Sequence, residues 1–125
     1  MAFVYDSDTH KITMPQGDTA DIDVAIDYAG IGPGDALMFA IFDPQSGDLM
    51  RKTVELQDGR AHIRLCNHDT RDIAPGTYRW QLRIVTNPAR DADGNIIADD
   101  CTDDVISVFD EKQPVIKIYR GGAYV

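Results

Sequence analysis

The chain has 125 residues, 43% of them hydrophobic, and a formal net charge of −9. This length suits one domain with a single core, and the acidic charge disfavours nucleic acid or an anionic membrane as a partner. The longest apolar run, 36–42, has the length of a strand and is too short to cross a bilayer. The N-terminus lacks a basic region followed by an apolar one, so we expect no secretory signal and synthesis in the cytoplasm.

The first third of the chain predicts strands separated by turns. Residues 3–14 indicate a short leading strand with a polar interruption, and Pro15-Gln16-Gly17-Asp18 predicts a turn. Residues 19–28 then alternate with a period of two, which is typical of a strand with one buried face. The buried face holds Ala20, Ile22, Val24, Ile26 and Tyr28, and the other face holds Thr19, Asp21, Asp23 and Asp27. The glycine-rich segment 29–35 predicts a loop.

The segment 36–43 predicts a strand whose two faces are both apolar. One face holds Leu37, Phe39 and Ile41, and the other holds Met38, Ala40 and Phe42. Such a strand is either covered on both sides within its own chain or covered by another chain. Residues 49–56 and 61–65 predict the next two strands, joined by a hairpin turn at 57–60.

Residues 67–73 are the only segment with helical character, about two turns at most, with Asn67 as the expected N-cap. Pro75-Gly76 then opens a strand that runs to about Thr86. Alternation places four apolar side chains of this strand in the core, so its aromatic rings indicate packing rather than a sugar-binding platform. These side chains are Tyr78, Trp80, Leu82 and Ile84.

The polar segment 87–104 predicts a hairpin with a type I′ turn at Asp93-Gly94, after which 105–109 returns to the sheet. Residues 115–119 predict either a final strand or an arm, and 120–125 a mobile tail. We therefore expect a sandwich domain at 1–112 and a C-terminal strand or arm at 113–125. Seven or eight short strands with one helical turn predict an all-β, immunoglobulin-like β-sandwich.

No motif for catalysis, metal binding or cofactor binding is present. The three histidines, His10, His62 and His68, have no partner at ligand spacing. Cys66 and Cys101 are expected to be reduced, although their spacing also allows a disulfide. We therefore expect that the protein is not an enzyme and that it binds no metal ion and no cofactor. Two alternatives stay open: a calcium ion among the acidic residues of 99–104, and a pocket that gathers His62, His68 and carboxylates.

Three stretches carry a family resemblance: Ile12-Thr13-Met14-Pro15-Gln16-Gly17-Asp18-Thr19, then 65–78 (LCNHDTRDIAPGTY), then Trp80-Gln81-Leu82 leading to Asp93-Gly94-Asn95. Together they resemble the immunoglobulin-like N-terminal domain of phage baseplate upper proteins and related small tail proteins of phages and prophages. The resemblance covers about 12–109. It implies a non-enzymatic structural or adaptor protein of a phage or prophage tail or baseplate, made in the bacterial cytoplasm and then part of the virion.

The implied partners are other tail or baseplate proteins, or a second copy of the chain. The expected contact surface combines the doubly apolar strand with the C-terminal arm, which can add to the edge of a neighbour's sheet. Its residues are Met38, Phe42, Val115, Ile116, Ile118, Tyr119 and Tyr124. If the arm acts between chains, deletion of 113–125 leaves the fold intact and abolishes assembly. The alternative is that both features are satisfied within the monomer.

The sequence leaves two other functions as alternatives. A carbohydrate-binding or adhesion module that recognises a bacterial surface requires a row of exposed aromatic rings, and the sequence offers only Tyr119 and Tyr124. A small enzyme or enzyme inhibitor requires a site that no residue pattern here indicates.

Overall fold

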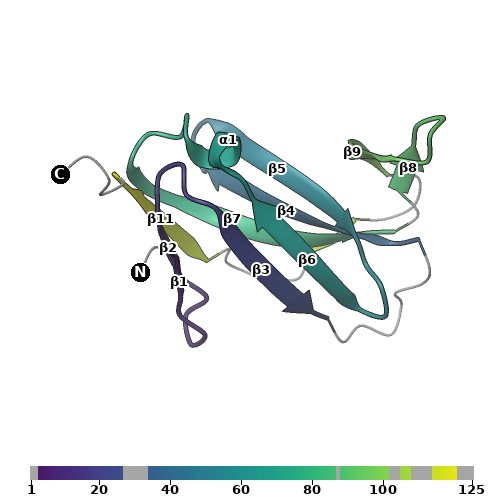
Figure 1. Cartoon of the computed structure of the whole chain (residues 1–125), viewed down its shortest axis with the longest axis horizontal. Coiled ribbons are helices and arrows are strands. Elements are labelled where there is room, and N and C mark those ends of the chain that lie inside the picture. Colours follow the sequence, from purple (N-terminus) through teal and green to yellow (C-terminus); the bar gives the residue numbers. More distant parts are fainter. Residues whose placement is uncertain (1–2, 27–33, 87, 102–104, 108–113, 121–125) are drawn as a thin grey trace.

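The computed structural model describes residues 3–26, 34–86, 88–101, 105–107 and 114–120. Its strands form a seven-stranded sheet, a two-stranded sheet that packs over it, and a separate hairpin (Figure 1). The elements are β1 (Val4–Tyr5), β2 (Ile12–Pro15), β3 (Ala20–Ala25), β4 (Ala36–Asp43), β5 (Gly47–Glu55), β6 (Arg60–Leu65), α1 (Asn67–Thr70), β7 (Gly76–Val85), β8 (Pro88–Arg90), β9 (Ile96–Cys101), β10 (Val105–Ser107) and β11 (Val115–Tyr119).

The large sheet has the order β1-β2-β11-β7-β4-β5, and β10 also pairs with β7. β11 runs parallel to β2 and antiparallel to β7, so a segment from the end of the chain joins one from its beginning. The second layer consists of β3 paired antiparallel with β6. This arrangement confirms the predicted all-β sandwich. Within the described residues the strands outnumber the predicted seven or eight, because β1, β8 and β10 are only two or three residues long.

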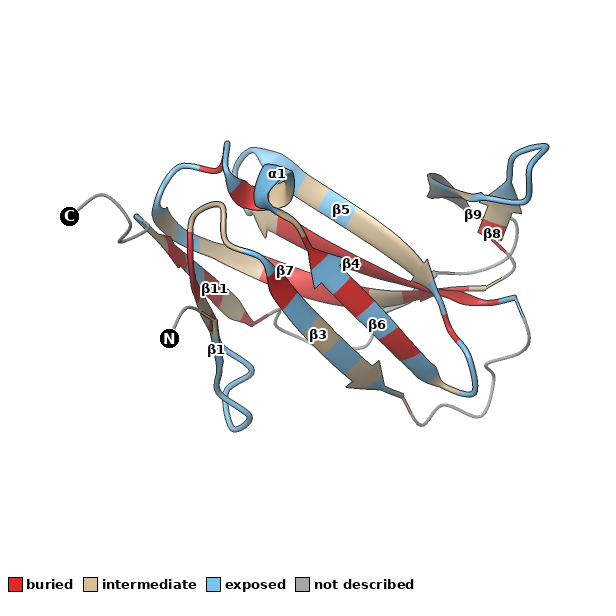
Figure 2. Cartoon of the chain, viewed as in Figure 1, coloured by how far each residue is buried: buried red, intermediate tan, exposed pale blue. Residues whose placement is uncertain are grey.

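The core lies between the two layers, and strand alternation decides which side chains enter it (Figure 2). Inward residues of β4 and β11 are fully buried, among them Phe39 and Ile116. The rings of Phe39 and Trp80 lie 5.6 Å apart between centroids, and the indole N–H of Trp80 donates to the carbonyl of His10 at 2.9 Å. Trp80 is therefore a core residue with its polar atom satisfied, as the alternation predicted.

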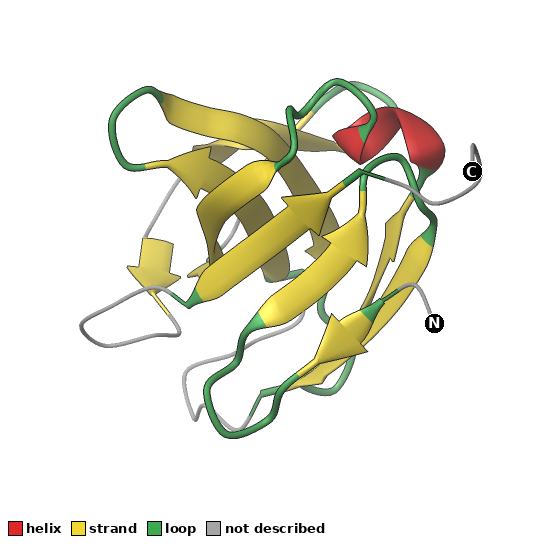
Figure 3. Ribbon diagram, turned by 90° about the vertical axis from the view of Figure 1, so that its left-hand side faces the viewer, coloured by secondary structure: helices red, strands yellow, loops and turns green. Residues whose placement is uncertain are grey.

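The helix α1 sits at one end of the sandwich and is bonded to the turn after β2 (Figure 3). The backbone N–H of Gly17 donates to the buried Thr70 Oγ1 at 2.9 Å, and Asn67 Nδ2 donates to the Gly17 carbonyl at 2.8 Å. Gln16 Nε2 reaches the carbonyl of Ile73 at 2.9 Å. Two of the stretches that carry the family resemblance thus meet in one polar contact, which explains them structurally.

Two local predictions need correction. Cys66, not Asn67, is the N-cap of α1, because the carboxylate of Asp69 accepts the Cys66 backbone N–H at 2.7 Å and frees Asn67 to bond across to Gly17. The turn of the β8–β9 hairpin is not type I′, because only Gly94 has a positive φ (+86°), and its N–H donates to the Asp91 carbonyl. By contrast Asp58 and Gly59 both have positive φ, as the predicted hairpin turn between β5 and β6 requires.

The segment 115–119 is a strand inside the large sheet rather than an arm. β11 lies between β2 and β7, and its Ile116 and Ile118 side chains are 0% and 1% exposed. A strand with partners on both sides has no free edge to add to a neighbour's sheet. The expectation that 113–125 can be deleted without loss of the fold is therefore revised.

Candidate interaction surface

The outer face is the side of the large sheet that points away from β3 and β6. Strand register aligns Phe42 on β4 with Arg79 on β7, and Arg79 with Val115 on β11. Since side chains of paired residues lie on the same side of a sheet, Arg79 stands between two apolar neighbours. Phe42, Arg79 and Val115 are all half-buried. This row lies near the middle of the sheet and is flanked on β11 by the exposed Lys117.

Basic residues are concentrated on this outer face although the chain carries a net charge of −9. Ala40 is paired with Arg51 on one side and Gln81 on the other, and Met38 lies between Thr53 and Arg83. Two described carboxylates on the same face are bonded to basic residues: Asp48 to Arg51 and Glu55 to Arg90. The outer face thus combines apolar and cationic groups.

Two buried polar groups of the outer face lack a hydrogen-bond partner in the part of the chain that the structure describes. Among the described residues, two side-chain atoms, Arg83 Nε and Thr53 Oγ1, are buried without a hydrogen-bond partner. They lie on either side of Met38, which is 6% exposed. Unsatisfied buried polar atoms are uncommon in folded proteins, so a water molecule or another partner group is expected at each of these two atoms.

One end of the outer face is covered by the β8–β9 hairpin. Ile96 of β9 packs against the buried Ala36, Met38 and Val85. The guanidinium of Arg90 fixes the hairpin there, because it donates to Glu55 Oε1 at 2.8 Å and to the carbonyls of Gly94 and Gly34. The doubly apolar strand β4 is therefore covered by its own chain at this end, while Phe42 at the other end stays partly open.

The predicted contact residues separate into three groups. Phe42, Val115 and Tyr119 lie on the outer face and are half-buried. Met38 shares that face but is only 6% exposed. Ile116 and Ile118 were wrongly assigned to the surface, because period-two alternation turns them into the core, and Tyr124 lies outside the described residues. The sequence pattern did not indicate Arg79, because alternation within one strand gives no sign that Phe42 and Val115 are its neighbours.

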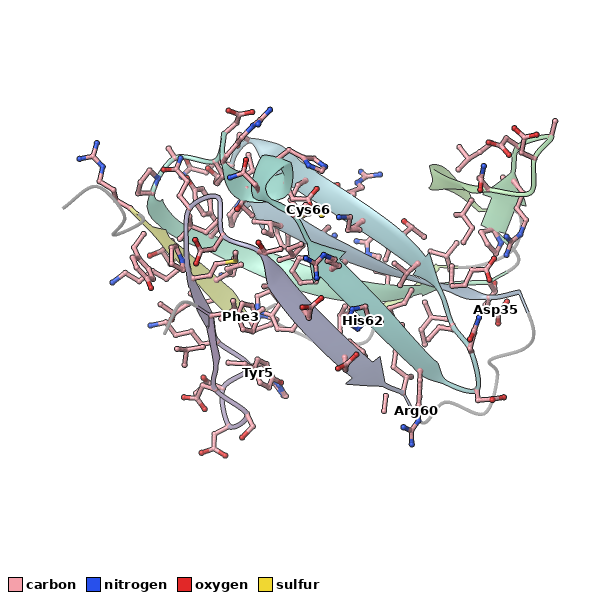
Figure 4. The ribbon with its side chains drawn as sticks, in the orientation of Figure 1. Phe3, Tyr5, Asp35, Arg60, His62 and Cys66 are labelled. Carbon is pink, nitrogen blue, oxygen red and sulfur yellow. The ribbon has the colours of Figure 1, made fainter. Side chains whose placement is uncertain are left out.

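A second cluster of charged residues lies on the outer surface of β3 and β6, where Figure 4 labels His62. Asp23 Oδ1 lies 2.6 Å from Nδ1 of His62, and Asp21 Oδ1 lies 3.1 Å from its Nε2. Arg64 donates to the same Asp21 oxygen at 3.1 Å. The hydrogen bond to Asp23, helped by Asp21, raises the pKa of His62 above its ordinary value.

We expect an NMR pH titration of His62 to give a midpoint above about 6.5, the ordinary value of a histidine. The pKa of His62 is raised in the folded state. The stabilisation from these contacts is therefore fully present below the pKa of His62 in the unfolded chain, and it is lost as the pH rises through its pKa in the folded protein. Asp23→Asn should move the midpoint back toward the ordinary value. Asp8→Asn, which removes an exposed carboxylate of the β1–β2 loop, serves as the control. An unshifted His62 in the parent protein would contradict the assignment.

His62 and His68 line two different cavities. One, of about 760 Å³, opens beside His62 and is lined by the carboxylates of Asp23, Glu55 and Asp58. His68 lines the other, of about 510 Å³, at α1. Neither gathers both histidines, and the described residues around the larger cavity include no serine, cysteine, lysine or tyrosine to act as a nucleophile.

Other candidate chemistry is equally limited in the part of the chain that the structure describes. Three or more histidine, cysteine or carboxylate side chains do not gather there in a way that could hold a metal ion. Cys66 is a half-buried free thiol. The side chains of 99–104, where a calcium ion was considered, lie outside the described part. Nor does any described helix have the length and apolar character needed to cross a membrane.

Lys52 joins three elements at the edge of the core. Its Nζ donates to the carbonyl of Arg64 on β6 and to Asp69 Oδ2 on α1, each at 2.6 Å. Burial opposes ionisation of Asp69, but the bonds from Lys52 and from the Cys66 N–H outweigh it and lower its pKa. The cation is thus used to hold the fold together and is not available to a ligand.

Comparison with known proteins identifies no relative: no protein-family model matches the chain, and no curated protein or solved structure is significantly similar to it.

Proposed function

We propose that this chain is a non-enzymatic structural or adaptor protein that acts through protein–protein contacts made by its outer face. The observation that supports this most directly is the row Phe42–Arg79–Val115, in which an arginine stands between two half-buried apolar side chains. Arginine and aromatic residues are enriched in protein interfaces, where a buried apolar contact and a directional charge act together.

The setting we propose is the tail or baseplate of a phage or prophage. The family resemblance supports this setting, and it implies another tail protein or a second copy of the chain as the partner. The alternative of a carbohydrate-binding module has less support. Among the described aromatic residues Tyr78 and Trp80 pack in or against the core, and Tyr5 and Tyr119 lie on β1 and β11 with β2 between them.

The test is to measure the solution mass by size exclusion with light scattering, alone and after co-expression with each protein encoded beside the gene. We expect a complex of defined mass that Arg79→Glu weakens by about tenfold or more, because a desolvated arginine is a typical interface anchor. Arg60→Glu, an equal charge change on β6 of the opposite layer, serves as the control. Equal losses in both variants, or a monomer with every candidate, would overturn the proposal.

A further inference from the structure

The two layers of the sandwich differ in width, and β3 forms an open edge of the narrower one. Within the described residues β3 pairs only with β6. The far edge of β6 is partly covered, since Lys52 bonds the Arg64 carbonyl and Gln57 bridges to Arg60. The far edge of β3 has no equivalent cover among the described residues (Figure 1).

The backbone of β3 offers hydrogen-bonding groups to that open edge. The N–H of Ile26 donates to the Gly59 carbonyl at 2.7 Å, so the peptide groups of Ile26 point toward β6. The peptide groups of alternate residues in a strand point to the same side. The N–H and C=O groups of Asp21, Asp23 and Ala25 therefore point away from β6, toward the open edge. Three donors and three acceptors therefore face outward in a row, as a further strand would require.

The core beneath this edge is incompletely covered. Ile22 pairs with Ile63 and Val24 pairs with Ala61, and all four side chains face the large sheet. Ile63 is 0% exposed, whereas Ile22, Val24 and Ile26 are only half-buried. This difference in exposure is between directly paired residues of β3 and β6, so we attribute it to the open side of β3. A further strand beside β3 would remove it.

The aromatic side chains of Tyr5 on β1 and of Phe3, which precedes β1, bound the same opening. Tyr5 pairs with Ile12, whose side chain is in the core, so Tyr5 and Phe3 face the inner side of the large sheet. Phe3 packs against the core, and Tyr5 is 44% exposed. Figure 4 shows both side chains on the side of β1 where β3 lies. A strand laid along β3 would meet apolar groups from both elements.

The charges on β3 select the kind of strand that fits. Asp21 and Asp23 are exposed on its outer surface, at two of the three positions whose peptide groups face the edge, and they contact His62 and Arg64 of β6 on their other side. A second copy of β3 added antiparallel would place carboxylates opposite carboxylates, which is unfavourable. A strand with basic residues on the outer side and apolar residues on the inner side would instead pair with Asp21 and Asp23 and cover Ile22 and Val24.

We infer that the open edge of β3 is a docking site for an extended segment of a partner protein that alternates basic with apolar residues, added antiparallel as an extra strand of the second layer. Main-chain hydrogen bonds supply the affinity of such a contact, and alternate side chains supply the selection. This site belongs to the layer opposite the outer face, so it does not depend on the function proposed above.

The test uses a fluorescent synthetic peptide of alternating lysine and valine, with binding followed by anisotropy. We expect saturable binding that is about tenfold weaker in the double variant Asp21→Asn/Asp23→Asn. The control Asp72→Asn/Asp93→Asn also removes two exposed carboxylates, one after α1 and one in the β8–β9 turn, both away from the edge, and should bind as the parent does. A peptide of alternating glutamate and valine should not bind. No saturable binding, or equal loss in the two double variants, would overturn the inference.

Backbone methylation separates an added strand from general attraction between charges. In antiparallel pairing the lysines lie opposite Asp21 and Asp23, so their N–H groups point to β3 and the valine N–H groups point away. Methylation of the lysine nitrogens should abolish binding, while methylation of the valine nitrogens should preserve it. Equal binding by the two methylated peptides would overturn the inference. Arg79→Glu should leave peptide binding unchanged, which keeps this result distinct from the test of the outer face.

Discussion

A chain that ends at Lys112 is expected not to fold. The truncation removes β11, which lies between β2 and β7 in the large sheet. It uncovers Ile12 and Met14 on one side and Tyr78 on the other, and it removes the fully buried Ile116 and Ile118. Loss of one buried isoleucine side chain costs about 2–5 kcal/mol, so the loss of two together with a central strand is comparable to the whole stability of a small domain, about 5–15 kcal/mol.

Circular dichroism during heating should then show no cooperative transition for the truncated chain. Two point variants separate the loss of packing from the loss of length. Ile118→Ala should lower the free energy of unfolding by about 3 kcal/mol, whereas Lys117→Ala, one residue earlier and exposed, should change it by less than about 0.5 kcal/mol. A truncated chain that unfolds cooperatively near the temperature of the parent would show that β11 is dispensable.

Sequence periodicity was sufficient to locate most strands but not to arrange them. The bounds 36–43 and 115–119 agree with β4 and β11, because alternating or doubly apolar runs between turn residues leave little freedom. The pairing of β11 with β2 joins segments about a hundred residues apart in a parallel register. Nothing in the local pattern of either segment specifies that contact, so β11 could equally be interpreted as an arm.

The same limit applies to the outer face. Phe42 and Val115 were selected from the sequence because each belongs to an apolar segment, but the residue that joins them is Arg79. Its position became visible only through the register of three strands. The assignment of Ile116 and Ile118 to the surface was wrong for a related reason. The whole segment was assigned to the surface, although successive side chains of a strand point to opposite faces of the sheet.

The open edge of β3 could be partly anticipated. The alternation of 20–26 placed Asp21 and Asp23 outside and Ile22 and Val24 inside, and the structure agrees. That β3 lies at an edge depends on the absence of a further described strand beside it, which is a property of the whole topology. The half-buried state of its inner residues is likewise a consequence of this position rather than of their type.

Phe39→Ala is expected to destabilise the protein far more than Phe42→Ala, although both residues belong to β4. Phe39 is fully buried and packs against Trp80, with 5.6 Å between ring centroids. Its truncation leaves a cavity at the centre of the core, which should cost about 3–5 kcal/mol. Phe42 lies on the outer face and is half-buried, so we expect a cost of about 1 kcal/mol. Urea denaturation of the parent and of the two variants measures both losses in the free energy of unfolding.

The comparison also separates stability from binding, because the two phenylalanines lie on opposite faces of one strand. Phe42→Ala should retain the parent's cooperative unfolding and yet weaken the complex that Arg79→Glu disrupts, since the two side chains are neighbours in the same row. Phe39→Ala should affect binding only as far as it populates unfolded chain. If Phe42→Ala unfolds as readily as Phe39→Ala, the outer face near β11 is part of a core, and an interface there is contradicted.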